Sequence, residues 1–232
     1  MAGRPGHSEK KSSSDDLEQV SKSFWSSQGE QYPNYGTTKQ RRFFEIQYVL
    51  GRLDLLDCPP RTLLDVGCGT GATVTILREL IDAEKYFCYD VSAGMVSTID
   101  SRPVRGAEID VNIVDFTTLP SDFTFPAADL ILCFGLFQCL SDGTVKDVLK
   151  RINGKSLLVR DACYLPHEGR QDINTYSTQL QSQYACHYRT LDEYISLCTD
   201  FGWNLVDVRR AFPDKIESDF GTKQWFLHLE RR

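Results

Sequence analysis

The sequence contains no long apolar stretch. No run of apolar residues reaches the roughly 20 residues that a membrane-spanning helix needs. The first residues, Met1 to Gly6, also lack the apolar core of a secretory signal. We therefore expect a soluble, cytoplasmic protein that has no membrane partner.

An excess of basic residues is also missing. The 232 residues include 26 Lys and Arg against 32 Asp and Glu, which gives a formal net charge of -6. A protein that binds nucleic acid usually presents a basic face, so this balance argues against a nucleic-acid partner. The length suits one domain with a sizeable core better than two.

The eight cysteines include no Cys-x-x-Cys pair, the spacing typical of zinc sites. Most of them lie in apolar, strand-like runs, where a free thiol behaves as a small hydrophobic group. A disulfide framework is not expected in a chain of this size that has no secretory signal. We expect no metal site.

What the sequence does contain is a glycine-rich turn after an apolar run. Asp65 ends that run, and Gly67, Gly69 and Gly71 follow before a helical pattern begins. Such glycines let the backbone turn sharply and approach a ligand, and the helix that follows offers unpaired N–H groups. The spacing comes close to a dinucleotide pattern, but Asp65 would repel a pyrophosphate and suits a cationic ligand.

Three later strand-like segments each end in residues that could reach the same ligand. Asp90 follows the glycine turn by roughly 20 residues, the spacing of a ribose-binding carboxylate. Asp115 and Phe116 end the second segment, and Phe134 ends the third. Taken singly, each acid could be a turn or N-cap residue and each aromatic a core residue, so their order and spacing carry the prediction.

Together these segments resemble the motifs of class I S-adenosylmethionine-dependent methyltransferases over about residues 20–232. The resemblance implies S-adenosylmethionine as the cofactor. It implies the following cofactor-binding residues: Asp65, Gly67, Gly69, Gly71, Asp90, Asp115, Phe116 and Phe134. In such a site Asp90 binds the two ribose hydroxyls, Asp115 accepts from the adenine amino group, and Phe116 flanks the ring. Phe134 opens onto the place where methyl donor and acceptor meet.

The alternation of strands and helices after Arg61 predicts an α/β fold. We expect strands near 61–67, 85–90, 109–114, 128–134 and 155–161, and helices near 71–83, 92–100 and 142–152. Thr190 begins a capped helix that ends at Gly202, and apolar runs at 203–212 and 223–230 follow without an intervening helix. The fold expected is a Rossmann-like, seven-stranded, mostly parallel sheet with a C-terminal antiparallel hairpin and helices on both faces.

The N-terminal part has a different pattern. Residues 1–15 are polar and are expected to form a disordered tail, residues 16–56 an N-terminal helical lid segment, and residues 57–232 the methyltransferase domain. Small-molecule members of the family often begin with an aromatic segment that folds over the cofactor. Residues expected there are Trp25 and Tyr35 for the substrate and Tyr32 for the cofactor. Arg41 or Arg42 could pair with the cofactor carboxylate.

The acceptor side is predicted after the fifth strand. Asp161 ends that strand at the functional edge of the sheet and is the first candidate to orient an amine or take its proton. Tyr188 and His187 are the next catalytic candidates, and Gln138 and Tyr164 are candidate substrate contacts. The long connection after Asp161 is expected to form a substrate cap.

The acceptor itself is less well defined. Phe134-Gly135 stands where methyltransferases that act on DNA bases or glutamine have an Asn/Asp-Pro-Pro-aromatic motif, which disfavours that class. The acceptor that we expect from the family resemblance is an amine or hydroxyl of a small molecule. A weaker resemblance to protein alpha-N-terminal methyltransferases, around Asp161 and Tyr188, leaves a peptide N-terminus as an alternative. A non-catalytic cofactor-binding subunit and a nicotinamide-dependent oxidoreductase are further alternatives, and Asp65 argues against the last.

Overall fold

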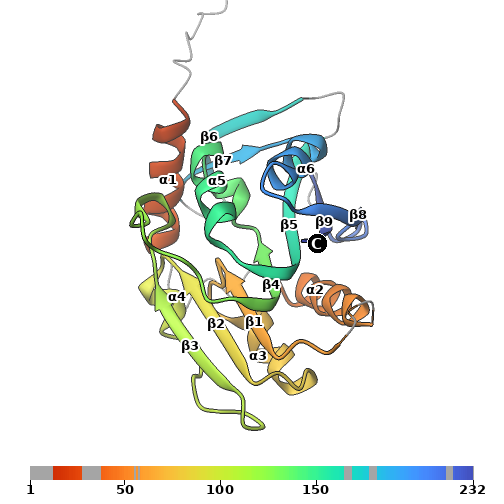
Figure 1. The fold of residues 1–232 in the computed structure, drawn as a ribbon. Helices are drawn as coiled ribbons and strands as arrows, with labels where there is room; N and C mark the ends of the chain where they lie inside the picture. The colour runs from red at the N-terminus through yellow and green to blue at the C-terminus, as the bar shows by residue number, and fades with distance from the viewer. Residues whose placement is uncertain are drawn as a thin grey trace, which may run out of the picture.

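The computed structural model describes residues 13–27, 38–54, 56, 58–164, 169–177, 182–217 and 222–231. A seven-stranded sheet in the order β3-β2-β1-β4-β5-β9-β8 forms its centre (Figure 1). The strands are β1 (Thr62–Val66), β2 (Lys85–Asp90), β3 (Glu108–Ile113), β4 (Ala128–Phe134), β5 (Gly154–Tyr164), β8 (Asn204–Arg210) and β9 (Thr222–Glu230). Strands β1 to β5 pair in parallel, whereas β9 pairs antiparallel with both β5 and β8. This confirms the expected sheet with its C-terminal hairpin.

Both faces of the sheet are covered, because its central strands are apolar on both sides. Successive side chains alternate between the faces, so Leu63 packs with Val49 and Leu77 while Leu64 packs with Val148. The first face carries α2 (Thr38–Leu53) and α3 (Ala72–Leu80), and the second carries α5 (Asp142–Arg151) and α6 (Leu191–Thr199). Helices on both faces are therefore confirmed.

Short capped elements follow the strands at the carboxyl-end edge of the sheet. Ser92 caps α4 (Ala93–Val96), Asp115 caps the 3₁₀ turn η2 (Phe116–Thr118), and Ser141 caps α5. The expected N-terminal cap of α6 is present as a capping box, since the Thr190 side chain accepts from the Glu193 N–H and the Glu193 side chain accepts from the Thr190 N–H. These caps fix where each strand end turns toward the candidate site.

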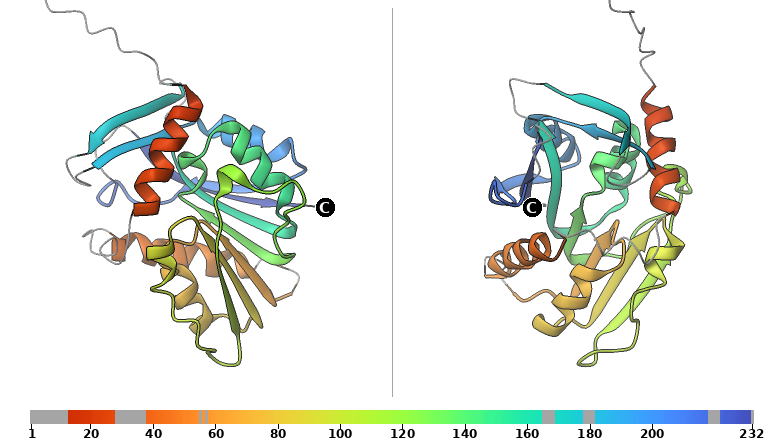
Figure 2. Two further views of the ribbon diagram at one scale, coloured as in Figure 1. Left: turned by 90° about the vertical axis from the view of Figure 1, so that its left-hand side faces the viewer. Right: turned by 180° about the vertical axis from the view of Figure 1, so that it is seen from behind.

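The N-terminal helices have different positions. Helix α1 (Ser14–Ser27) lies at the carboxyl-end edge of the sheet and buries Leu17 and Phe24 against neighbouring elements (Figure 2). Helix α2 instead belongs to the core, where Ile46 and Val49 pack against the sheet. Of these two helices, only α1 therefore lies where a lid over the sheet edge is expected. Residues 1–12, with most of the predicted tail, lie outside the described part of the chain, as do Tyr32 and Tyr35, so the division into tail, lid and domain stays a prediction.

An additional hairpin, which was not among the expected strands, follows β5 in the long connection that is expected to form a substrate cap. Strands β6 (Gln171–Ser177) and β7 (Ser182–Tyr188) form a separate two-stranded antiparallel sheet. The Tyr164 N–H donates to the Arg189 carbonyl at 3.1 Å, which ties the base of this hairpin to the end of β5. The hairpin stands above the second 3₁₀ turn, η3 (Phe137–Cys139), and beside α1 (Figure 2).

The described residues include neither a candidate membrane span nor a candidate metal cluster. No helix within the described ranges has both the length and the apolar character that spanning a membrane requires. Over the same ranges, no three His, Cys, Asp or Glu side chains are grouped as metal ligands would be. All eight cysteines are free thiols.

Candidate active site

The glycine turn links β1 to α3. Gly67, Gly69 and Gly71 all have positive φ, at 80°, 55° and 65°. Gly71 is the most constrained of them, because a Cβ there would lie 2.7 Å from the Ile99 side chain. A residue with a side chain would meet both the steric conflict and the backbone cost of the left-handed region. The sequence motif therefore forms the sharp turn that its glycines predict.

Asp90 holds this turn from the neighbouring strand. Its carboxylate accepts hydrogen bonds from the Gly69 N–H at 2.8 Å and the Ser92 N–H at 2.9 Å. Burial raises the pKa of Asp90, against the opposing effect of these backbone donors. The Val91 N–H is a third backbone donor, and an ionised carboxylate offers about four acceptor positions. The side chain therefore fixes the turn and keeps acceptor capacity for a ligand hydroxyl.

Asp65 faces α2, on the other side of the same turn. Burial raises its pKa to about 7, and the Arg42 guanidinium nearby acts in the opposite direction. Arg42 donates to Glu45 at 2.7 Å and to the Thr73 hydroxyl in the first turn of α3. Arg41 instead lies over the Phe212 ring, 5.7 Å from its centroid. Of the two arginines, Arg42 is thus the one beside the turn.

Asp115 and Phe116 follow the end of β3 and lie under α1. Asp115 accepts from the Thr117 N–H and pairs with Lys22 of α1 at 2.5 Å. Phe116 is buried in the core and also lines a cavity of about 40 Å³. The cavity is lined by Ser21, Lys22, Val91, Asp115, Phe116, Thr117, Leu136, Cys139 and Leu140. The expected adenine region is therefore the place where α1 meets the sheet edge.

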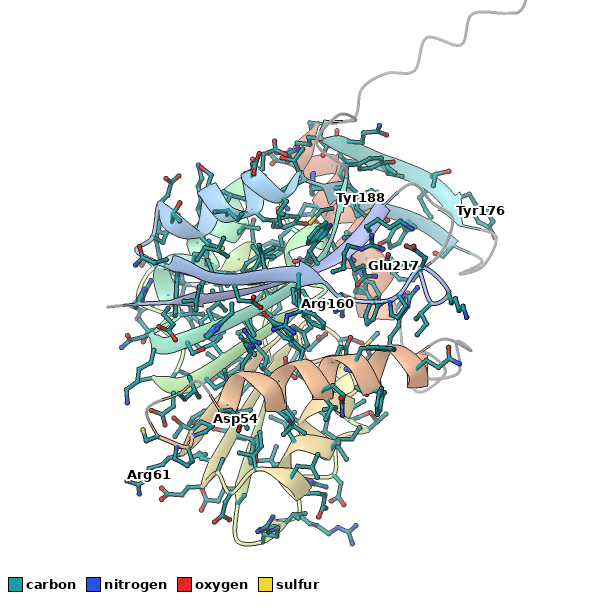
Figure 3. The ribbon with its side chains drawn as sticks, turned by 90° about the vertical axis from the view of Figure 1, so that its right-hand side faces the viewer. Asp54, Arg61, Arg160, Tyr176, Tyr188 and Glu217 are labelled. Atoms are coloured by element: carbon teal, nitrogen blue, oxygen red, sulfur yellow. The ribbon has the colours of Figure 1, made fainter. Side chains whose placement is uncertain are left out.

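Phe134, at the end of β4, faces α2 and not the cavity under α1. The Arg160 guanidinium lies 5.8 Å from the centroid of the Phe134 ring. Arg160 also pairs with the buried Glu45 at 3.2 Å and donates to Gln224 of β9. Figure 3 shows Arg160 between α2 and the pair β8–β9. Glu45 thus joins Arg160 to Arg42, which is a link that the sequence analysis did not predict.

Two hydrogen bonds of Asp161 and Gln138 connect β5 with η3. The Asp161 carboxylate accepts from the Gln138 N–H at 3.4 Å, and the Gln138 side chain accepts from the Ala162 N–H at 3.1 Å. Asp161 is completely buried, and burial raises its pKa to about 7. This geometry gives Asp161 a role in holding η3, and its action on an acceptor stays a prediction.

Arg189 secures η3 from the side of the hairpin. Its guanidinium donates to the Phe137 carbonyl at 2.6 Å, the Leu140 carbonyl at 2.7 Å and the Asp142 carboxylate at 2.6 Å. From the sequence, Arg189 is only one of the polar residues expected on the acceptor side after the fifth strand. Its contacts with η3 were not predicted, because an arginine after a polar segment is indistinguishable from an exposed one. Together with Asp161, it fixes the segment that follows β4.

The remaining candidates lie around η3 and the hairpin. The His187 ring is buried, with Nδ1 2.9 Å from Asp172, and burial lowers its pKa. Tyr188 contacts Tyr164, with ring centroids 5.7 Å apart, and the Trp25 indole N–H donates to the Cys139 sulfur at 3.2 Å. The structure therefore brings Trp25, Tyr164 and Tyr188 to the elements around η3, whereas His187 lies on the opposite face of β7 from Tyr188.

Comparison with known families gives a match to one domain. Residues 64–162 match the model of the methyltransferase domain family. A curated protein from Synechococcus sp., described only as uncharacterized, is 30% identical over 101 residues, which is 41% of this chain and 22% of the relative. The matched segment spans about a fifth of that relative's length.

Solved structures with a similar fold cover nearly the whole chain. Geranyl diphosphate C-methyltransferase from Streptomyces coelicolor has a TM-score of 0.65 and 11% identity, over 93% of this chain and 98% of the other. Magnesium protoporphyrin IX methyltransferase from Synechocystis PCC 6803 has a TM-score of 0.62 and 13% identity, over 94% and 98%. A methyltransferase from Leishmania major has a TM-score of 0.64 and 14% identity, over 93% and 85%. At such identities the likeness concerns the fold.

The family model covers the segment from β1 to β5, which carries the glycine turn and Asp65, Asp90 and Asp115. The strand order and the antiparallel hairpin at the sheet edge agree with it. Residues 64–162 therefore belong to the methyltransferase domain family, and the chain has the fold of class I S-adenosylmethionine-dependent methyltransferases.

Proposed function

We propose that this chain binds S-adenosylmethionine along the carboxyl ends of β1, β2 and β3 and transfers its methyl group to an amine or hydroxyl of a small molecule. One observation carries the proposal. Asp90 at the end of β2 accepts a hydrogen bond from the Gly69 N–H in the turn after β1. The carboxylate expected to bind the ribose and the glycine turn therefore form one connected site. Asp115 lies at the end of the adjacent strand β3.

Each part of the cofactor has a matching group in this chain. The free acceptor capacity of Asp90 suits a ribose hydroxyl, and Asp115 suits the adenine amino group. Arg42, which is fixed by Glu45 beside the first turn of α3, suits the carboxylate of the methionine part. Asp65 suits its ammonium group, because a bound cation would favour the charged form of this buried acid.

The chemistry demands little from the protein. The sulfonium of S-adenosylmethionine supplies a methyl group that is already activated. The protein must hold the accepting atom in line with that methyl group and keep water away. We expect the fixed segment η3 and the aromatic side chains Trp25, Tyr164 and Tyr188 to do so, since they contact one another or η3 at the carboxyl-end edge.

An acceptor that arrives protonated must lose a proton. Because burial lowers the pKa of His187, its imidazole is neutral at physiological pH. Its Nδ1 faces Asp172, and Nε2 has no hydrogen-bond partner among the described residues. Tyr188 is the second candidate, on the other face of the same strand.

The fold neighbours support a small acceptor. Two of them are a geranyl diphosphate C-methyltransferase and a magnesium protoporphyrin IX methyltransferase, so both names specify a small organic substrate. The proposal that the accepting group is an amine or hydroxyl rests on the sequence of this chain and not on these neighbours.

A transfer assay with a labelled methyl donor tests this proposal. The purified chain is incubated with panels of small amines, small hydroxyl compounds and peptides that have a free basic N-terminus, with the Asp90→Asn variant as the control. Labelling of a small amine or hydroxyl compound by the wild type and not by the variant supports the proposal. Labelling of peptides alone indicates the alternative acceptor. Cofactor binding without any labelling would indicate a non-catalytic subunit.

A further inference from the structure

Lys22 of α1 contacts the acid that is expected to receive the adenine amino group. Its ammonium lies 2.5 Å from Asp115 Oδ2, and the two side chains are 29% and 26% exposed. Lys22 and Asp115 are 93 residues apart in the chain. The contact therefore joins the N-terminal helix directly to the cofactor side of the site.

The hydrogen-bond capacity of Asp115 is already filled. Oδ1 accepts from the Thr117 N–H at 3.0 Å and the Thr117 hydroxyl at 2.7 Å. Oδ2 accepts from the Thr118 hydroxyl at 3.0 Å and from Lys22. An ionised carboxylate offers about four such acceptor positions. An incoming amino group must therefore replace one of these four donors.

Lys22 is the donor that can be replaced at the lowest cost. The Thr117 and Thr118 donors come from residues two and three positions after Asp115 and form the N-cap of η2, so their loss would undo that turn. Lys22 comes from a separate helix and carries a flexible side chain, which can reach water when it is released.

The space between α1 and the sheet edge is also too small for a purine in this arrangement. The cavity that Lys22 and Asp115 line has a volume of about 40 Å³. Pockets that hold small-molecule ligands usually measure about 300–1,000 Å³. Entry of the base therefore requires movement of α1 or of its side chains, as well as the loss of the ion pair.

The same face of α1 also contacts the acceptor side. Glu18 accepts from the Ser141 N–H at 2.8 Å, and the Trp25 indole donates to Cys139. Glu18, Lys22 and Trp25 follow one another at intervals of four and three residues, so they share one face of the helix. A shift of α1 at Lys22 would therefore also act on η3, next to the expected acceptor.

We propose that Lys22 occupies the position of the adenine amino group on Asp115, so that α1 is a lid that cofactor binding must release at Lys22. This inference rests on the proposed function, because it takes Asp115 as the carboxylate that accepts a hydrogen bond from the adenine amino group. Its consequence is self-competition: the ion pair lowers the affinity of the protein for its own cofactor. Release at Lys22 also makes η3 responsive to the cofactor before an acceptor binds.

Calorimetry with S-adenosylhomocysteine on the full chain tests this inference. Lys22→Met removes the ammonium and keeps the apolar stem, and Lys22→Gln serves as a second variant if the first does not fold. We expect binding about two- to fivefold tighter than in the wild type, the range that partly exposed ion pairs correspond to. Lys146→Met, at an exposed lysine of α5, is the matched control and should bind as the wild type does.

High salt provides a second readout. Screening weakens the Lys22–Asp115 pair, so the affinity difference between the wild type and Lys22→Met should narrow as salt increases. Equal or weaker binding by both Lys22 variants overturns the inference. The Asp115→Asn variant separates this result from a failure of the proposed site. If Asp115→Asn weakens binding while the Lys22 variants leave it unchanged, only the inference about Lys22 is wrong. If Asp115→Asn binds the cofactor normally, the assignment of Asp115 to the adenine amino group fails.

Discussion

The Asp90 carboxylate accepts the Gly69 N–H at 2.8 Å, which joins the end of β2 to the glycine turn after β1. The same carboxylate accepts the Ser92 N–H at the start of α4. Asp90 thus has two functions, since it shapes the turn and offers its remaining acceptor capacity to a ligand. Substitutions in this region must be designed to separate the two effects.

Replacing Asp90 by asparagine should remove most cofactor affinity and leave the fold largely intact. The amide oxygen can still accept one backbone N–H, whereas alanine would leave the backbone donors unsatisfied. Loss of a charge-assisted hydrogen bond to a ribose hydroxyl is expected to weaken binding about 100-fold. Calorimetry with S-adenosylhomocysteine measures this change, and the exposed Asp110→Asn on β3 is the matched control. Unchanged affinity in Asp90→Asn would remove Asp90 from the ribose site.

Arg42→Gln should weaken cofactor binding, and Arg41→Gln should not. Arg42 lies at the first turn of α3, whereas the Arg41 guanidinium lies over Phe212. Loss of a charged hydrogen-bond partner for the methionine carboxylate is expected to reduce the affinity for S-adenosylhomocysteine roughly tenfold. Titration with adenosine, which has no carboxylate, provides the control, because neither variant should change its affinity. A larger loss in Arg41→Gln than in Arg42→Gln would reverse the assignment.

Gly71→Ala should destabilise the fold more than Gly106→Ala does. Both glycines have positive φ, but a Cβ at Gly71 would lie 2.7 Å from Ile99, while a Cβ at Gly106 would meet open space. Gly106→Ala therefore measures the backbone cost, about 1 kcal/mol. Gly71→Ala adds a packing conflict of about 1–3 kcal/mol. Chemical unfolding of the two variants compares them, and equal destabilisation would show that the turn can relax around the added methyl group.

Asp161 should make stability depend on pH. Its pKa is raised from an ordinary value near 3.9 to about 7 in the folded protein, mainly by burial. The native state therefore retains a proton between about pH 4 and 7 that the unfolded chain has lost. The contribution of this group to the free energy of unfolding accordingly falls as the pH rises through that window.

Asp161→Asn removes the titration and keeps an oxygen acceptor for the Gln138 N–H. The stability gain of this variant over the wild type should therefore grow from pH 5 to pH 7, by about 1 kcal/mol per pH unit, and then level off. Urea unfolding at several pH values measures this difference. A constant difference between pH 5 and pH 8 would contradict the raised pKa of Asp161.

The strands and the cofactor motifs were predictable because their signals are local. Apolar runs mark β1 to β5, the glycines mark the turn, and Thr190 with Glu193 marks the start of α6. The hairpin β6–β7 was not predicted, because its strands are largely polar and their alternation is weak. Only scattered aromatic and β-branched residues, such as Ile173 and Tyr184, indicated it.

The contacts that shape the candidate site were harder to predict from the sequence. Whether Arg41 or Arg42 faces the turn depends on the rotation of α2 against α3. The pairing of Lys22 with Asp115 depends on how α1 crosses the sheet edge. Such long-range side-chain contacts are set by tertiary packing, and no periodicity in the sequence encodes them.

The most direct test of the central claim is calorimetry of the full chain with S-adenosylmethionine, S-adenosylhomocysteine and NADH. We expect that both adenosyl compounds bind at one site per chain and that NADH does not bind. Binding of NADH, or no binding of either adenosyl compound, would contradict the assignment of the glycine turn, Asp90 and Asp115 as a methyltransferase cofactor site.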